Sequence, residues 1–304
     1  MFVISLIVLT KNGSQYLPSV LSALFCQKDV PPYEVIAIDS GSTDDTVALL
    51  KSYPLRLQQI PAAAFHHART RNYAATLASG EMLVFLSQDA VPSSNIWLNR
   101  LTANFRDSQV GAVYGRQLSK PGSFAERKET FDSIYGEKKL VKDPANPHSL
   151  GYRFYLFSDA NAAVRKSVWQ ATGFPEDLKV FEDIGIAKRI FDKGWKIVYE
   201  PEAAVIHSHN HTTSGLFRRY FDLGYTLKRL KIWDAPGIRQ SLARDAWKML
   251  GGKFRNQKSN CQKVTSGAGV HKDLAKSFGL LLGVNQSYLP LALKRHLSAF
   301  RLFG

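Results

Sequence analysis

The chain has 304 residues, and its 45% hydrophobic and 21% charged residues are typical of a globular protein with a substantial core, not of a disordered chain. The apolar N-terminus, residues 2–13, lacks the basic start and small-residue cleavage site of a signal peptide and is too short to span a bilayer. The net charge of +15 is uneven, because residues 1–205 hold 23 Lys+Arg and 21 Asp+Glu, whereas residues 206–304 hold 17 and 4. We therefore expect a nearly neutral catalytic or binding part, followed by a basic part that meets a membrane surface, a nucleic acid or an anionic substrate.

Short apolar runs alternate with helical patterns in the first 120 residues. Such alternation predicts an α/β fold, in which a mostly parallel sheet carries helices on both faces. Right-handed crossovers then bring the carboxyl ends of the strands, with Asp39 and Asp89, to one edge of the sheet. The expected strands are 2–9, 34–38, 55–60, 82–86 and 110–116, and the expected helices are 14–27, one starting at 42–45, 67–78 and 96–105.

The second half begins with a polar, Pro- and Lys-rich stretch, 136–151, which we interpret as a mobile loop. Residues 216–233 interleave aromatic and aliphatic side chains with basic ones and predict a helix, whereas 278–284 is apolar but far short of the ~20 residues of a spanning helix. Two further strands, 162–165 and 195–200, and a helix, 183–193, are expected between these segments.

Four polar clusters follow strands or open helices. Their residue types suit a nucleotide with a bound cation: a carboxylate can accept a hydrogen bond from a base or a ribose, an arginine at a helix start can pair with a phosphate, and an aspartate can hold a divalent cation. Taken singly, each cluster is equally or better explained by turns, helix caps and surface residues. The clusters are Thr10–Asn12, Asp39–Asp44 (which includes Ser42), Phe65–Asn72 (which includes Arg71) and Gln88–Ala90.

The combination is more specific than its parts. Over about residues 1–210, the order of these motifs resembles that of the inverting family 2 glycosyltransferases of GT-A fold. The motifs are TKN after the first strand, then DSGSTDDT, then a helix with RN, and then a strand that ends in QDAVP. The segments SQDAVP and FHHARTRN look most like the bacterial rhamnosyltransferase branch, which uses dTDP-L-rhamnose in surface polysaccharide (O-antigen) synthesis. The family usually shows an Asp-x-Asp metal motif, and here the matching residues are Ser87, Gln88 and Asp89, so a single carboxylate remains.

The resemblance also implies roles for individual residues. Asp183, in the sequence FED at a helix start, matches the general base of the family, and Glu182 is the second choice. Asp159 and Asn161 match the segment that lines the sugar and acceptor site. For the metal, Mg²⁺ or Mn²⁺, the implied ligands are Asp89 and either His207 or His209. The alternative for the two histidines is a purely structural role. The implied nucleotide-sugar site consists of Thr10, Asn12, Asp39, Ser42, Arg71, Asn72, Gln88 and Asp89.

These expectations divide the chain into a catalytic domain, 1–210, with a nucleotide-sugar half at about 1–118 and an acceptor half at about 119–210, and a basic, mainly helical region, 211–304. The resemblance implies a polyprenyl-diphosphate-linked glycan as the acceptor and a cytoplasmic location, peripheral on the inner face of the cell membrane. A basic amphipathic helix suits an anionic membrane surface, with Arg218, Arg219, Lys228, Arg229 and Lys231 towards the head groups, and the alternative is a solvated helix packed on the catalytic domain.

Other functions remain open at this point. The first is a glycosyltransferase with a UDP- or GDP-sugar donor. A nucleic-acid-binding protein is disfavoured because no recognised module is present, so we expect no nucleic-acid partner. A nucleotidyltransferase would carry a Gly-rich basic loop after its first strand, which TKNGSQY matches poorly. Finally, a non-catalytic nucleotide-binding protein is suggested by Gln88 and opposed by the intact Glu182–Asp183 pair.

Overall fold

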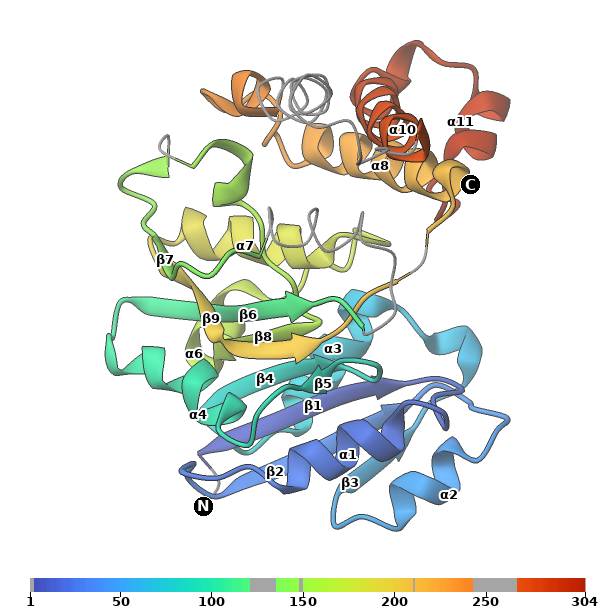
Figure 1. The fold of residues 1–304 in the computed structure, drawn as a ribbon. Coiled ribbons are helices and arrows are strands. Elements are labelled where there is room, and N and C mark those ends of the chain that lie inside the picture. The colour runs from blue at the N-terminus through green and yellow to red at the C-terminus, as the bar shows by residue number, and fades with distance from the viewer. Residues whose placement is uncertain (1–2, 121–134, 148–149, 210, 243–266, 304) are drawn as a thin grey trace, which may run out of the picture. The chain divides into compact units, whose positions relative to one another are not determined.

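The computed structural model describes residues 3–120, 135–147, 150–209, 211–242 and 267–303 (Figure 1). The chain divides into two compact units, which we describe separately. The first contains residues 1–146, 155–177 and 182–208, and the second contains 147–154, 178–181 and 209–304. The division after residue 208 lies close to the expected boundary at 210, and two short earlier segments join the second unit.

The first unit is built on one nine-stranded sheet with the order β3-β2-β1-β4-β8-β6-β9-β5, and β7 pairs with β9 outside this path. Its strands are β1 (Ile4–Thr10), β2 (Tyr33–Asp39), β3 (Arg56–Gln59), β4 (Met82–Ser87), β5 (Val91–Pro92), β6 (Val110–Leu118), β7 (Leu140–Lys142), β8 (Asn161–Arg165) and β9 (Lys196–Ile206). The expected α/β fold is confirmed, since β1, β2, β3 and β4 are all parallel neighbours.

The other half of the sheet is mixed. β8 lies between β4 and β6 and is antiparallel to both, whereas β6 and β9 are parallel to each other. The short strands β5 and β7 both run antiparallel to β9. The antiparallel strand β8 therefore separates the parallel strands β1–β4 from β6 and β9.

Helices cover both faces of this sheet, as expected. Side chains of α1 (Leu17–Phe25) and α4 (Trp97–Thr102) pack against alternate residues of the strands in one core cluster, and Figure 1 shows α1 in front of β1 and β2. On the opposite face, Phe85 of β4 packs edge-on against Phe174, 5.1 Å between ring centroids. The remaining helices of the first unit are α2 (Thr46–Lys51), α3 (His67–Leu77), α6 (Lys166–Thr172) and α7 (Glu182–Asp192), with short 3₁₀ turns at Ala62–Ala64 and Ala103–Arg106.

The segment 136–151, expected to be a mobile loop, is partly a strand, because β7 forms three pairs with β9. Lys142, the last residue of β7, is 1% exposed; its ammonium group donates a hydrogen bond to the Leu156 carbonyl and lies 4.5 Å from the centroid of the Tyr114 ring. Burial lowers the pKa of Lys142 well below its ordinary value. The composition of this segment did not indicate a strand, because the buried residue of β7 is Lys142 and not an apolar residue.

The second unit is mainly helical. It contains α8 (Thr213–Arg229), α10 (Gly267–Val284) and α11 (Leu291–Leu297), with 3₁₀ turns at Gly151–Phe154 and Gln286–Tyr288. Glycines bring α8 and α10 into close contact, because a Cβ on Gly224 would overlap the Leu280 carbonyl and one on Gly283 would overlap the Phe221 carbonyl. Within the described residues, no helix combines the length and the apolar character that crossing a membrane requires.

Candidate active site

Loops at the carboxyl ends of neighbouring strands gather at one sheet edge, as expected. Asp39, at the end of β2, is fully buried, and its carboxylate accepts hydrogen bonds from the backbone N–H groups of Gly41 (3.1 Å) and Ser42 (3.0 Å) and from the Thr10 hydroxyl (3.2 Å). Gly41 has φ +72°, which glycine adopts without strain. Asp39 thus orders the DSGS turn, and its contact with a base stays a prediction.

The loops after β1 and β4 join this turn. The backbone N–H of Asn12 donates to the Ser42 hydroxyl (2.8 Å), and the Asn12 amide oxygen accepts from the Thr43 N–H (2.9 Å). The Gln88 side chain bonds both the N–H (2.9 Å) and the carbonyl (3.0 Å) of Lys11. Five of the residues expected to hold the nucleotide therefore form one connected polar surface, in which Gln88 ties β4 to β1: Thr10, Asn12, Asp39, Ser42 and Gln88.

Asp89 and His207 follow β4 and β9 and lie next to each other. Asp89 Oδ1 is 3.4 Å from His207 Nε2, and the two side chains are 13% and 9% exposed. The Lys120 ammonium group lies 3.8 Å from Asp89 Oδ2. A carboxylate, an imidazole and a cationic side chain thus meet at the sheet edge that holds the polar loops.

These two residues fit a divalent cation. Carboxylate oxygen and imidazole nitrogen are ligands that Mn²⁺ accepts, and diphosphate oxygens and water would complete the coordination. The attraction of Lys120 to Asp89 indicates that a positive charge is favoured at this position. His209 belongs to the second unit, but chain length alone keeps its Cα within about 7 Å of that of His207. Its role as a ligand stays a prediction.

We expect Asp89→Ala to weaken the binding of a nucleoside diphosphate roughly 10- to 100-fold in the presence of Mn²⁺ and to change it little without a cation, because the variant loses the single carboxylate at this position. Calorimetric titration measures both conditions. The exposed Asp177 provides a control, since Asp177→Ala removes the same charge elsewhere. Equal affinities of Asp89→Ala and wild type with Mn²⁺ would remove Asp89 from the cation site.

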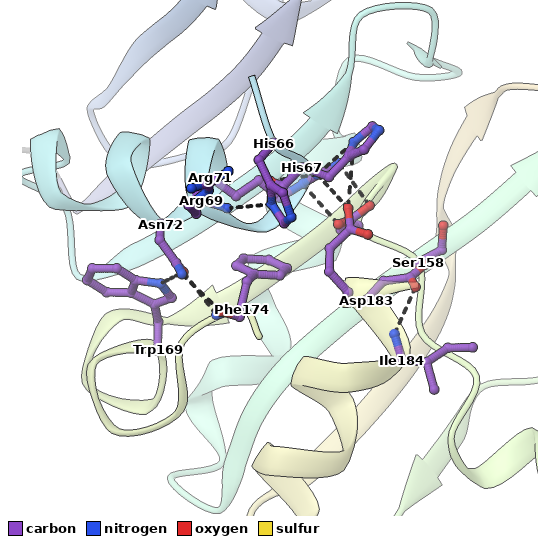
Figure 2. Close-up of polar contacts among 12 residues, drawn as sticks. His66, His67, Arg69, Arg71, Asn72, Ser158, Trp169, Phe174, Asp183 and Ile184 are labelled. Carbon is purple, nitrogen blue, oxygen red and sulfur yellow. Dashed lines mark hydrogen bonds and ion pairs between the residues drawn. The ribbon is translucent and has the colours of Figure 1, made fainter. Parts of the chain in front are cut away.

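Arg71 is the centre of a buried ionic cluster (Figure 2). The side chain extends from α3 and is 8% exposed. Its Nε and Nη2 atoms lie 2.9 and 3.1 Å from the two carboxylate oxygens of Asp159, and Nη1 donates to Glu182 at 2.8 Å. We expected Arg71 to meet a phosphate, but here its guanidinium group is held by two carboxylates.

The charges in this cluster do not balance, because one guanidinium faces two carboxylates. Burial raises the pKa of Asp159 to about 6, although the Arg71 charge opposes this shift. Burial alone would lower the pKa of Arg71, but Asp159, Glu182 and Asp183 together raise it. Arg71 is therefore a permanent cation, and Asp159 holds its proton more tightly than an exposed aspartate does.

Glu182 and Asp183 are the first two residues of α7, and they face different surroundings. Glu182 is 6% exposed and paired with Arg71, with His67 Nδ1 at 3.7 Å. Asp183 is half-buried, and one of its oxygens accepts from the Ile184 N–H at 2.8 Å. Glu182 is buried and engaged by Arg71, whereas Asp183 is only half-buried, so the geometry favours Asp183 over Glu182 as the carboxylate that an acceptor hydroxyl can reach.

Two other predicted site residues have structural partners. The Asn72 amide bonds the backbone of Phe174, both N–H and carbonyl at 2.9 Å, and accepts from the Trp169 indole at 3.1 Å. Asn161 is fully buried; its amide accepts from Trp97 (3.0 Å) and donates to the Ala203 carbonyl (2.8 Å). The structure thus places Asn161 in the core, whereas Asp159 is part of the Arg71 cluster.

Lys120 was missed by the sequence analysis. It lies just beyond β6, so the rule that pointed to Asp39 and Asp89, a polar residue after a parallel strand, would have found it. Lys120 Nζ also lies 5.0 Å from the centroid of the Tyr16 ring, which borders the loop after β1.

Comparison with known proteins gives a consistent assignment. The profile of the family described as "Glycosyl transferase family 2" matches residues 5–172. The O-antigen chain rhamnosyltransferase RfbN of Salmonella typhimurium is 32% identical over 309 residues, which cover 99% of this chain and 95% of that protein. WbaN of Salmonella anatum, also an O-antigen chain rhamnosyltransferase, is 34% identical over 280 residues, which cover 90% of this chain and 86% of WbaN.

Solved structures share the fold at lower identity. TarS (residues 1–349) of S. aureus in complex with UDP-GlcNAc has a TM-score of 0.60 and 18% identity, covering 98% of this chain and 84% of that one. The mannosyltransferase PcManGT of Pyrobaculum calidifontis, in complex with GDP-Man and Mn²⁺, has a TM-score of 0.57 and 20% identity, covering 99% and 85%.

Proposed function

The chain belongs to glycosyl transferase family 2, and we propose that it is an inverting rhamnosyltransferase that moves L-rhamnose from dTDP-L-rhamnose to a polyprenyl-diphosphate-linked glycan in O-antigen synthesis. The observation that carries this proposal is the similarity to two O-antigen chain rhamnosyltransferases over 90% or more of the chain. The shared length includes the basic C-terminal region as well as the catalytic part.

The site supports the chemistry of a single displacement. Asp183 takes the proton from an acceptor hydroxyl as its oxygen attacks the anomeric carbon, and the bond to the nucleoside diphosphate breaks on the opposite face. Arg71 holds Glu182 in a buried ion pair, whereas Asp183 is half-buried and belongs to the same turn of α7. A divalent cation on Asp89 and His207 would neutralise charge on the departing diphosphate.

Calorimetric titration of dTDP, UDP and GDP, each with and without Mn²⁺, tests the donor class. We expect selective binding of dTDP, enhanced by the cation. Preference for UDP or GDP, the nucleotides of the sugars bound in the TarS and PcManGT structures, would keep the fold and reaction type but remove rhamnose. Binding of none of the three nucleotides would contradict the enzymatic role.

We also propose that the second unit attaches the protein to the cytoplasmic face of the membrane. The expected contact was the basic side of α8, but Arg219 lies over the Phe181 and Phe300 rings and Lys228 pairs with Asp234 at 2.9 Å. Exposed apolar side chains instead occur on α10, α11 and the turn between them, next to basic residues at the end of α11. The apolar residues are Phe278, Leu281, Tyr288, Leu291 and Leu293.

Flotation of the full chain with vesicles tests this attachment. We expect binding to vesicles with anionic lipid at low salt, weakened by salt because part of the attraction is electrostatic. Phe278→Ser combined with Leu281→Ser should reduce binding, whereas Tyr73→Ser, which alters an exposed aromatic residue of the first unit, should not. Absence of flotation at low salt would contradict the proposal.

A further inference from the structure

The side chain of Gln117, a residue of β6, contacts the His207 ring at Nδ1, the nitrogen that does not face Asp89. Gln117 is 6% exposed, and its Oε1 lies 2.8 Å from His207 Nδ1. The Nε2 atom of the same amide is 3.0 Å from the Tyr135 hydroxyl and 2.8 Å from the Ser158 hydroxyl. All four residues belong to the first unit.

These contacts indicate which nitrogen of the His207 imidazole carries the proton. The two N–H donors of the Gln117 amide are directed to the two hydroxyl oxygens, so its Oε1 is left as the acceptor that faces His207. A neutral imidazole carries one proton, and an acceptor at Nδ1 requires that proton on Nδ1. The Nε2 atom of His207 then presents a lone pair.

That lone pair faces a second electron-pair donor, because Asp89 Oδ1 lies 3.4 Å from His207 Nε2. These two electron pairs repel each other, and the Lys120 ammonium group lies on the other carboxylate oxygen, 3.8 Å from Asp89 Oδ2, and not between them. A cation shared by Oδ1 and Nε2 would remove the repulsion. The opposite tautomer would remove this repulsion by placing a proton between them, and it would also block Nε2 as a ligand. The orientation of Gln117 therefore decides whether this pair is ready to receive a metal ion.

We propose that Gln117 is a positioning residue of the cation site: by accepting the Nδ1 proton of His207 it keeps the Nε2 lone pair directed at Asp89, so that the two residues form a prepared pair of ligands for a divalent cation. This inference deepens the proposed function and rests on it for the use of the cation. The placement of the proton itself is independent of any sugar donor.

A local irregularity of the sheet makes the contact. The register of β6 against β9 shifts between Gly115, paired with Glu200, and Gln117, paired with Val205. The Pro201–Ala204 stretch of β9 takes up this shift, and the backbone N–H of His207 then bonds the Leu118 carbonyl at 2.9 Å. Register shifts of this kind re-aim side chains next to active sites, and this one lies at Gln117 and two residues before His207.

The tautomer can be measured directly. We would record two-dimensional ¹⁵N–¹H spectra of metal-free protein labelled with ¹⁵N-histidine, above the pH at which an ordinary histidine is protonated, and assign the His207 signal by its loss in His207→Gln. Wild type should show the proton on Nδ1. Gln117→Leu should lose this preference, and Gln117→Glu should keep it because a carboxylate also accepts. Gln109→Leu, at an exposed glutamine just before β6, should keep it as a control.

Titration with Mn²⁺ alone, followed by the electron paramagnetic resonance of the free ion, gives the second readout. We expect Gln117→Leu to weaken Mn²⁺ binding about 10- to 100-fold and Gln117→Glu to restore it. A wild-type His207 with its proton on Nε2, or equal Mn²⁺ binding by wild type and folded Gln117→Leu, would overturn the proposal. A failure of dTDP selectivity would leave both results standing, so the two proposals are tested separately.

Discussion

Asp183→Asn is expected to lower kcat about 1,000-fold and to leave the affinity for dTDP nearly unchanged. The amide keeps the size of the side chain and can still accept from the Ile184 N–H, but it cannot take a proton from the acceptor hydroxyl. General-base catalysis contributes typically about 10²–10⁴ in rate, which sets the expected magnitude. Steady-state kinetics with a saturating donor, together with calorimetry of dTDP, separates catalysis from binding.

Asp192→Asn is the matched control for this variant. Asp192 is the last residue of the same helix, α7, and its exposed carboxylate pairs with Lys188 at 2.7 Å. We expect its kcat to stay close to that of wild type. If Asp183→Asn turned over normally and lost only nucleotide affinity, Asp183 would not be the base, and the reaction would require another carboxylate.

Arg71→Met is expected to destabilise the first unit by roughly 3–5 kcal/mol, because it leaves the buried carboxylates of Asp159 and Glu182 without their shared cation. Urea unfolding followed by tryptophan fluorescence measures this loss, since Trp97 is fully buried in the same unit. Arg189→Met is a suitable control, because Arg189 is a partly exposed arginine of the first unit. An Arg71→Met protein as stable as wild type would show that the cluster contributes nothing net.

The same cluster should make the stability of the protein fall as the pH rises. The pKa of Asp159 is about 6 in the folded state and has a reference value of 3.8, so the folded protein binds more protons than the unfolded chain between these values. This contribution to the unfolding free energy is complete below pH 3.8 and is lost as the pH rises through 6. Asp159→Asn should remove this slope, which is measured as a difference from wild type; an unchanged slope would contradict the raised pKa.

Local sequence patterns predicted most of the first unit. The runs 34–38, 82–86 and 110–116 correspond to β2, β4 and β6, and helix 67–78 corresponds to α3, because buried apolar strands and Gly- or Pro-bounded helices leave a strong local signal. The end of each parallel strand could then be located, which is why the loops around Asp39 and Asp89 were found together.

Features that depend on long-range pairing were not predictable. The antiparallel insertion of β8 and the short strands β5 and β7 follow from their neighbours in the sheet. Gln117 meets His207 next to a register shift between β6 and β9, and no pattern within β6 marks it. Arg71 and Asn72 lie in the N-terminal half of α3, which suggested an anion site, but their partners lie about 90 to 110 residues further along the chain.

The most direct test of the central claim is transfer itself. Purified protein would be incubated with dTDP-L-rhamnose, Mn²⁺ and polyprenyl-diphosphate-linked glycans extracted from cells in which the gene for this chain is deleted, since the natural acceptor should accumulate there. We predict release of dTDP, addition of one or more rhamnosyl units by mass spectrometry, and an anomeric configuration opposite to that of the donor by NMR. Retention of configuration, or transfer from UDP- or GDP-sugars and not from dTDP-L-rhamnose, would contradict the account.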